Sequence, residues 1–478
     1  MSPPVPYPRI IQGGMGVAIS GWKLARTVSM QGQLGVVSGT ALDLVAARLL
    51  GDGDPGGHLR RAFEHFPVPG VADEVLKRYY RSNGRASLEP YSNVAKFDIE
   101  HSDFTRDLNI IANFAEVWLA KEGHDNPIGI NFLEKIQPPI PSITFGAMLA
   151  EVDYVIMGAG IPKQMPAMIS AFANRLPGNY RITVEGAEPG DNNTIVLDPR
   201  DIIGEGGPIK RPDFLAIISS HTLAAFLSKD PVTTPDGFIV ELPKAGGHNA
   251  PPRGAMQLDE TGQPIYGKRD AIRWDRIKDI GLPFWIAGGY AGPELLKQAE
   301  QLGAVGIQVG TAFAMCDESG LAPDAKKEIR GLALAGEIEV YTDPRASSSG
   351  YPFKIVPLPG TAAMQDVYEE RKRICDLGYL RTAYKRDDGK VGYRCSAEPV
   401  KAYIRKGGTV EDTVGRKCLC NALLSNIDMG QVQKGLVEPM IVTAGDDLPR
   451  VVKTLGDEEG RYTASDVLEY LLGEPQDS

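Results

Sequence analysis

The sequence contains no hydrophobic run long enough to cross a membrane as a helix. Such a helix needs about 18 or more consecutive apolar residues, and even the apolar stretch 214–227 is interrupted by polar residues at 219–222. The first ten residues, MSPPVPYPRI, show no charged segment followed by an apolar one, so we expect no secretory signal. We therefore expect a cytoplasmic protein with no membrane partner.

The chain also has few cysteines, and its net charge is negative. Five cysteines in 478 residues are too few for a disulfide scaffold. The 51 basic and 61 acidic residues give a net charge of -10, which argues against nucleic acid as a main partner. With 42% hydrophobic residues, the chain is long enough to bury a sizeable core.

Short apolar runs recur along the first two thirds of the chain and alternate with helical patterns. The runs are nearly continuous in Val, Ile, Leu and Phe, as strands buried on both faces are. Alternation with helices is typical of a parallel sheet. The eight predicted strands are Arg9–Gln12, Leu34–Ser38, Ile128–Phe132, Tyr154–Met157, Phe214–Ile218, Gly237–Glu241, Phe284–Ala287 and Val305–Val309.

These strands predict an α/β fold, a (β/α)8 TIM barrel over residues 1–320. The barrel has two insertions. Residues 41–125, after the second strand, contain helical patterns near 58–66, 72–80 and 106–121. Residues 180–212 predict a hairpin of Tyr180–Glu185 and Thr194–Leu197. Residues 321–478 no longer show the alternation of strands and helices, and we predict that they form a C-terminal extension.

Glycine clusters follow four of the predicted strands. They are Gly13–Gly16 after the first strand, Gly246–Gly247 after the sixth, Gly288–Gly289 after the seventh and Gly310 after the eighth. In this fold the active site lies where the strands end, and glycine loops after the last two strands form the usual phosphate site. The alternative is that the glycines only make tight turns. No G-x-G-x-x-G sequence lies on a first strand–helix turn, so a Rossmann site is not indicated.

Several strings resemble the nitronate monooxygenases, formerly called 2-nitropropane dioxygenases. The strings are IIQGGMGVAISGWKLA, GINF, ELPKAGGHN, WIAGGYAGPE and GAVGIQVGTAF, and the resemblance covers residues 9–40 and 126–316. It implies a (β/α)8 barrel that binds FMN without a covalent bond.

The resemblance also implies roles for individual residues. Gly14, Met15 and Gly16 would pack against the isoalloxazine, and Asn131 would contact the flavin. Gly246 and Gly247 match the glycines of the family's A-G-G-H string. The phosphate-binding loops match Gly288, Gly289, Gln308, Val309, Gly310 and Thr311.

His248 is the candidate catalytic residue, because the family places this histidine beside the flavin. It would act as a base toward a neutral nitroalkane or as a positive partner for a nitronate, and imidazole suits both roles. The alternative is a structural histidine. Glu241 departs from the family, which often has glutamine seven residues before the histidine. A carboxylate there would repel an anionic reduced flavin unless it is protonated or paired.

The C-terminal extension carries a cysteine cluster and a basic segment. Cys375, Cys395, Cys418 and Cys420 fall within 46 residues, but their spacing lacks the paired C-x2-C of well-known zinc sites. Zinc ligands and buried free thiols both stay open, and the predicted site includes no metal. Residues 371–418 contain 13 Lys or Arg and 6 Asp or Glu. They form either a face that neutralises acidic neighbours or a docking patch for an acidic carrier protein.

The leading functional hypothesis is FMN-dependent oxidation of a small molecule, an alkyl nitronate, by dioxygen to a carbonyl compound and nitrite. Enoyl reductases that act in trans on polyketide or polyunsaturated fatty-acid synthases are the alternative within the same superfamily, because they share long insertions and extensions. NAD(P)H-dependent quinone reduction and a flavin-bound, non-catalytic interaction module are further alternatives. The oligomeric state stays open, a homo-oligomer included.

Overall fold

Eight parallel strands form a closed barrel in the computed structural model, which describes residues 7–473. Around the sheet the order is β1-β11-β10-β9-β8-β4-β3-β2. The seam between β1 and β2 closes because Gln12 N–H donates to the Leu34 carbonyl (2.9 Å) and Leu34 N–H donates to the Ile10 carbonyl (3.1 Å). The predicted (β/α)8 barrel is confirmed. Its strands are β1 Ile10–Gln12, β2 Gly35–Ser38, β3 Ile128–Leu133, β4 Tyr154–Gly158, β8 Asp213–Ile218, β9 Gly237–Glu241, β10 Phe284–Ala287 and β11 Gly306–Val309.

Alternate side chains of these strands fill the barrel interior. Ile11, Val36, Ile239 and Trp285 belong to one buried cluster, in which all four are fully buried. Their strand neighbours, such as Ile10 and Val37, pack instead into the larger core beneath the helices. Both faces of every strand therefore lie in apolar surroundings, which explains why the strands read as continuous apolar runs.

Helices surround the barrel, and two of them begin at recognisable residues. The Ser220 hydroxyl accepts a hydrogen bond from Leu223 N–H (3.0 Å) at the start of α9. Proline occupies the first position of α11, where its missing N–H costs nothing. The helices between the strands are α1 Trp22–Met30, α6 Ile140–Leu149, α7 Met165–Ala173, α9 His221–Leu227, α10 Trp274–Lys278, α11 Pro293–Gln301 and α12 Thr311–Met315.

The insertion after β2 is helical, as predicted, and has its own small core. Three of its helices match the predicted patterns: α3 His58–Phe63, α4 Val71–Tyr79 and α5 Asp103–Lys121. A fourth, α2 Leu42–Gly51, was not predicted. Phe63, Val75 and Tyr79 are buried together against α5, so the insertion is fixed to the barrel wall.

The predicted hairpin is only half right. β5 Gly178–Arg181 pairs antiparallel with β7 Thr194–Leu197, as predicted. Residues Val184–Glu185, however, form a separate strand, β6, which pairs parallel with β14 of the C-terminal extension. Ion pairs hold it there, since Lys385 of β14 bonds the nearby Glu188 at 2.9 Å. The prediction of one continuous strand over Tyr180–Glu185 is wrong because the extension supplies a competing edge.

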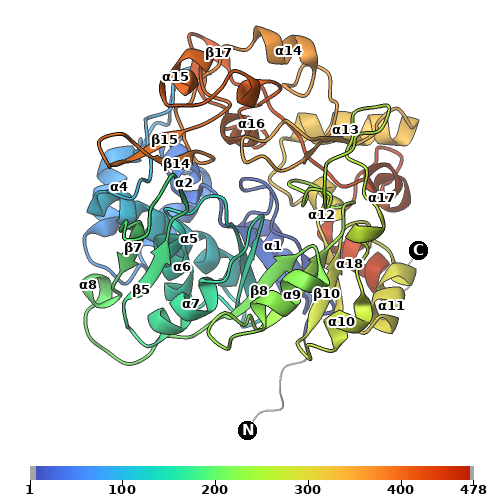
Figure 1. The fold of residues 1–478 in the computed structure, drawn as a ribbon, viewed down its shortest axis with the longest axis horizontal. Coiled ribbons are helices and arrows are strands. Elements are labelled where there is room, and N and C mark those ends of the chain that lie inside the picture. The colour runs from blue at the N-terminus through green and yellow to red at the C-terminus, as the bar shows by residue number, and fades with distance from the viewer. Residues whose placement is uncertain (1–6, 474–478) are drawn as a thin grey trace.

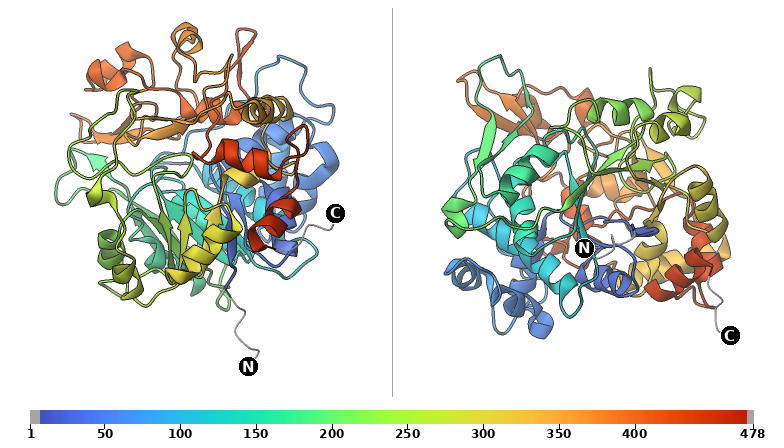
Figure 2. Two further views of the ribbon diagram at one scale, coloured as in Figure 1. Left: turned by 90° about the vertical axis from the view of Figure 1, so that its right-hand side faces the viewer. Right: turned by 90° about the horizontal axis from the view of Figure 1, so that it is seen from below.

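The C-terminal extension lies across the top of the barrel, opposite the N-terminal end of the chain (Figures 1 and 2). Its last two helices pack down the side of the barrel, with α18 against α1 and α11. Its elements are α13 Pro323–Ala335, β12 Tyr341–Asp343, β13 Phe353–Ile355, α14 Gln365–Glu370, β14 Thr382–Lys385, β15 Val391–Arg394, α15 Val400–Arg405, α16 Leu419–Ser425, β16 Val432–Gln433, β17 Leu436–Val437, α17 Leu448–Leu455 and α18 Ala464–Leu472.

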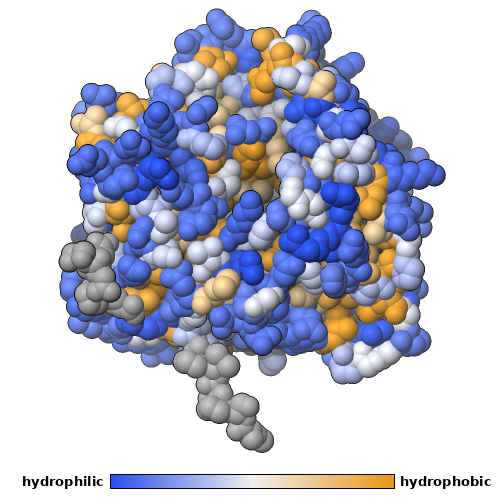
Figure 3. Space-filling model, turned by 180° about the vertical axis from the view of Figure 1, so that it is seen from behind, coloured by the Kyte–Doolittle hydropathy of each residue, from blue (hydrophilic) through white to orange (hydrophobic). Residues whose placement is uncertain are grey.

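Figure 3 shows that the face opposite that of Figure 1 is largely hydrophilic, with apolar residues in small separate groups. Of the helices between residues 7 and 473, none combines the length and apolarity needed to cross a bilayer.

Candidate active site

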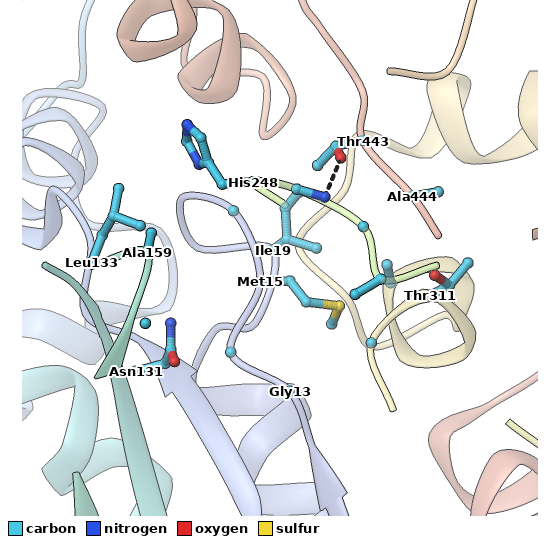
Figure 4. Close-up of a pocket in the computed structure, with 18 of the residues that line it drawn as sticks. Gly13, Met15, Ile19, Asn131, Leu133, Ala159, His248, Thr311, Thr443 and Ala444 are labelled. Carbon is cyan, nitrogen blue, oxygen red and sulfur yellow. Dashed lines mark hydrogen bonds between the residues drawn. The ribbon is translucent and has the colours of Figure 1, made fainter. Parts of the chain in front are cut away.

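A cavity of about 250 Å³ lies where the barrel strands end, beneath the C-terminal extension. Every site residue predicted from the sequence lines this one cavity, and Figure 4 shows Met15, Asn131, His248 and Thr311 among them. They are Gly14, Met15, Gly16, Asn131, Glu241, Gly246, Gly247, His248, Gly288, Gly289, Gln308, Val309, Gly310 and Thr311.

The loop after β1 approaches β3 so closely that it requires glycine. A Cβ atom on Gly14 would lie 2.4 Å from the Asn131 Cβ, which no side chain could tolerate. The loop is held by Ser20, whose hydroxyl accepts a hydrogen bond from Met15 N–H (2.9 Å). In Figure 4 this loop runs between Asn131 and Met15, and the Met15 sulfur lies 3.3 Å from where a Cβ atom of Gly310 would be.

The loops after β10 and β11 leave backbone donors without partners. Within residues 7–473, the N–H groups of Gly288, Gly289 and Gly310 donate no hydrogen bond, and all three residues line the cavity. Gly288 has φ +90°, and a Cβ there would lie 2.7 Å from the Leu242 carbonyl oxygen. The glycine thus makes a tight turn, and the turn leaves donors free for an anion such as phosphate.

Polar side chains with no protein partner complete the barrel side of the cavity. Within the described residues, the amides of Asn131 and Gln308 and the ammonium of Lys244 make no hydrogen bond or ion pair, and all line the cavity. A few unpaired polar groups in a concave site are typical of a ligand site. Together with the free N–H groups, they fit FMN, whose phosphate and ring nitrogens and oxygens need such partners.

Two titratable residues of the cavity have strongly shifted pKa values, in directions that keep both uncharged. Burial raises the pKa of Glu241, at the end of β9, to about 8. Burial, with a smaller contribution from the charge of Lys135, lowers the pKa of His248 to about 4. Near neutral pH Glu241 is therefore a carboxylic acid and His248 a neutral imidazole. This removes the repulsion expected of a carboxylate at position 241, and it disfavours a positive partner at position 248.

The C-terminal extension supplies the opposite wall of the cavity. Thr443 accepts a hydrogen bond from Gly247 N–H (2.8 Å, dashed in Figure 4), and Thr311 accepts one from Gly445 N–H (2.8 Å). Sequence reasoning did not place this wall at the site, because most of its residue types carry no chemical signal and Cys420 stood out only as a member of the cysteine cluster. The lining residues from the extension are Phe353, Tyr379, Leu380, Cys420, Leu423, Asn426, Val442, Thr443, Ala444 and Asp447.

Lys244 was also missed, although its place in the sequence gave a signal. It immediately precedes the glycine pair of the string K-A-G-G-H, and it lines the cavity with an exposed side chain. A cation at this rim can attract an anionic group toward the cavity.

The four cysteines of the extension come together around one small second cavity. All are free thiols, and Cys420 lines the main cavity as well. Over the part of the chain that the structure describes, no group of three or more His, Cys, Asp or Glu residues is arranged to hold a metal ion.

Many basic residues of segment 371–418 pair with acidic residues. Arg371 bonds Glu438 at 2.6 Å, Lys406 bonds Glu398 at 2.7 Å, and Lys385 bonds Glu188 at 2.9 Å. These pairs favour the interpretation that the segment neutralises acidic neighbours.

Comparison with known proteins agrees with the geometry. Residues 211–347 match the family model "Nitronate monooxygenase". A nitronate monooxygenase of Pseudomonas aeruginosa is 28% identical over 145 residues, which cover 29% of this chain and 40% of that protein. A probable nitronate monooxygenase of Bacillus subtilis is 34% identical over 94 residues, or 20% of this chain and 25% of that protein. The chain thus spans less than half the length of either relative.

Among solved structures, the enoyl reductase domain of MlnA from Bacillus amyloliquefaciens aligns with 98% of this chain and 93% of its own, at 13% identity and a TM-score of 0.49. The family model covers β8 to β11 and the A-G-G-H loop, the part of the barrel that carries His248 and the free N–H groups. Residues 211–347 of the chain are therefore similar to the nitronate monooxygenase family.

Proposed function

We propose that the protein is an FMN-dependent oxidoreductase that oxidises alkyl nitronates with dioxygen to a carbonyl compound and nitrite. The observation that carries the proposal is the single cavity that brings His248, Asn131 and the free N–H groups of the glycine loops together. In the overall reaction dioxygen supplies one oxygen atom to the carbon of each nitronate as its C=N bond breaks. Bound FMN would supply the electron transfer between substrate and dioxygen.

The residues of the chain have separate tasks in this proposal. The N–H groups of Gly288, Gly289 and Gly310 would hold the FMN phosphate. Each hydrogen bond to a charged group contributes about 1.5–3 kcal/mol, so three would hold it firmly. Met15, Asn131 and the neutral Glu241 would lie against the ring. The apolar wall of the extension would exclude water from the reacting centre.

His248 would act on the substrate as a neutral imidazole. Its depressed pKa means that it accepts or donates a proton through one nitrogen rather than attracting an anion with a permanent charge. The role of a permanently positive partner for a nitronate is therefore disfavoured, and the role of a base toward a neutral nitroalkane remains.

Two measurements test the proposal. Acid-released flavin from the purified protein is expected to chromatograph as FMN, and FAD would contradict the assignment. Anaerobic mixing with propyl-2-nitronate, NADH and NADPH in separate experiments is then expected to reduce the flavin with the nitronate alone. Reduction by a nicotinamide alone would indicate a reductase.

Enoyl reduction is the second candidate, and the apolar wall of the cavity is the observation that favours it. Tyr379, Leu380 and Leu423 line that wall and could contact an acyl chain. A neutral His248 could also donate the proton that an enoyl reduction requires. NADPH-dependent reduction of a crotonyl thioester, with no reaction toward nitronates, would replace the first proposal with this one.

A further inference from the structure

A loop of the C-terminal extension holds the candidate catalytic histidine from behind. The loop joins β12 to β13, and β13 runs alongside the A-G-G-H segment. Asn249 N–H donates to the Pro352 carbonyl and Lys354 N–H donates to the Gly247 carbonyl, both at 2.9 Å. The His248 and Phe353 rings meet edge to face with their centroids 4.8 Å apart. The imidazole is therefore fixed by the extension as well as by the barrel.

Two serines of this loop form a hydrogen-bonded chain that starts at the imidazole. The His248 Nε2 and Ser347 Oγ atoms are 2.7 Å apart, and the Ser347 and Ser349 Oγ atoms are also 2.7 Å apart. Ser347 is fully buried, and its carbonyl accepts a hydrogen bond from Arg416 (2.6 Å). Ser349 is only half-buried, and Gly350 beside it is exposed. The chain thus leads from the imidazole toward the surface.

The other ring nitrogen is available to a ligand. His248 lines the cavity, and within residues 7–473 its Nδ1 atom has no hydrogen-bond partner. The Nδ1 atom is also not among the completely buried polar atoms that lack a hydrogen-bond partner. One nitrogen of the ring therefore serves the cavity, and the other serves the serines.

The hydroxyl protons of Ser347 and Ser349 can be arranged in either of two directions along the hydrogen-bonded chain. Ser347 Oγ accepts a hydrogen bond from Ser349 N–H (3.2 Å), and Ser349 Oγ accepts one from Tyr351 N–H (3.4 Å). Each hydroxyl keeps one proton to donate and one further lone pair. The protons can point from Nε2 toward Ser349, or from Ser349 toward Nε2, and every hydrogen bond is kept in both cases.

We propose that Ser347 and Ser349 form a proton relay behind His248, which couples proton uptake at Nδ1 to proton release at Nε2. The proposal rests on the proposed role of His248. When a neutral nitroalkane gives its α-carbon proton to Nδ1, the Nε2 proton passes to Ser347 Oγ. The Ser347 proton passes to Ser349 Oγ, and the Ser349 proton passes to water. One proton enters and one leaves, so the imidazole stays neutral.

The surroundings of His248 explain why such a relay is needed. Burial and the nearby charge of Lys135 lower the pKa of His248, so an imidazolium in this site is unfavourable. A base that had to hold the extra proton would therefore be weak. A base that releases a proton from its far side avoids the charge.

Comparison of two substrates of Ser347→Ala separates a relay from a structural role. 1-Nitropropane must lose a proton before it is oxidised, whereas its preformed nitronate has already lost it. We expect kcat/KM to fall by roughly 10- to 100-fold with 1-nitropropane, a part of the 10²–10⁴ that an acid–base group provides. Oxidation of the preformed nitronate is expected to change little. Equal losses with both substrates would overturn the relay.

Three further variants control for damage to the loop. Ser348→Ala removes a hydroxyl from the same loop, but that hydroxyl donates to the Leu380 carbonyl and does not contact His248. Its activity toward both substrates is therefore expected to equal that of the wild type. Ser347→Thr keeps the hydroxyl and is expected to restore activity toward 1-nitropropane. Ser349→Ala is expected to give a smaller loss than Ser347→Ala, with the same substrate difference. A Ser347→Thr variant as impaired as Ser347→Ala would contradict the proposal.

Nitrogen-15 NMR of labelled histidine tests the relay without turnover. The His248 resonances are assigned by their loss in His248→Asn. We expect the wild type to hold the proton on Nε2 and Ser347→Ala to show a mixture of tautomers. An unchanged tautomer in Ser347→Ala would overturn the relay, whatever the enzyme oxidises. If the wild type turns over neither substrate while the tautomer shifts as expected, the proposed function fails and the hydrogen-bond chain stands.

Discussion

The two walls of the cavity differ in kind. The barrel wall offers backbone N–H groups and polar side chains, such as Asn131 and Gln308, that have no partner among residues 7–473. The extension wall offers mainly apolar side chains, together with hydrogen bonds that fix loops of the barrel. The comparison teaches that the two parts of the chain have different tasks. We expect the barrel to bind the cofactor and carry the chemistry, and the extension to select the substrate and position His248.

The sharpest test of the barrel wall is His248→Ala. We expect this variant to keep its flavin and to lose turnover of 1-nitropropane by roughly 10²- to 10⁴-fold, the usual contribution of a positioned acid–base group. Steady-state kinetics and the flavin spectrum measure the two effects. His65→Ala, at an exposed histidine, is the control. Full activity of His248→Ala would move the chemistry away from this wall.

Gly288→Ala is expected to weaken flavin binding. Its φ of +90° costs a residue with a side chain about 1–3 kcal/mol, and its Cβ would push against the Leu242 carbonyl. The loop should shift, and affinity for FMN should fall by about 5- to 150-fold, as fluorescence titration would measure. Gly207→Ala, where the added atom meets nothing within 4 Å, should bind FMN normally. Unchanged affinity in Gly288→Ala would argue against a phosphate site at this loop.

Leu423→Ala tests the extension wall. Leu423 belongs to α16, and shortening its side chain makes room in the cavity. We therefore expect the kcat/KM value for pentyl nitronate, divided by that for propyl nitronate, to rise about tenfold. Leu436→Ala, at a leucine that is 75% exposed, should leave the ratio unchanged. If flavin affinity changes and the ratio does not, the proposed division between the two walls is wrong.

The smallest expected effect is a pH-dependent gain in stability in Glu241→Gln. Below about pH 4.3, the ordinary pKa of glutamate, residue 241 is protonated in both the folded and unfolded chain. As pH rises toward 8, only the unfolded chain releases the proton, because the folded pKa is about 8, so the wild type loses stability. Between about pH 4.3 and pH 8, the Tm of Glu241→Gln should increasingly exceed that of the wild type, by on the order of 2 °C at most. Glu459→Gln, at an exposed position, should show none.

The barrel and its wall of the cavity could be predicted because their signals are local. Apolar runs such as Ile128–Phe132 mark strands buried on both faces, and a glycine directly after a strand marks a close approach. The helix α2 was missed although it is local, and β6 was misassigned because its partner lies about 200 residues further along the chain. Thr443 and Ser347 gave no signal. They are common residue types, and they act through hydrogen bonds to positions 196 and 99 residues away.

The bond between Thr443 and Gly247 also bears on the order in which the protein is made. A nascent chain that has just released β11 can pair all eight strands, but it lacks β13, α16 and the segment around Thr443. Synthesis of the remaining residues takes on the order of ten seconds at usual ribosome speeds. During that time the end of the barrel would be open, and its A-G-G-H loop would lack the hydrogen bonds that the extension provides. We therefore expect tight cofactor uptake to follow synthesis of the segment around Thr443, so translation sets the earliest moment at which the site can become active.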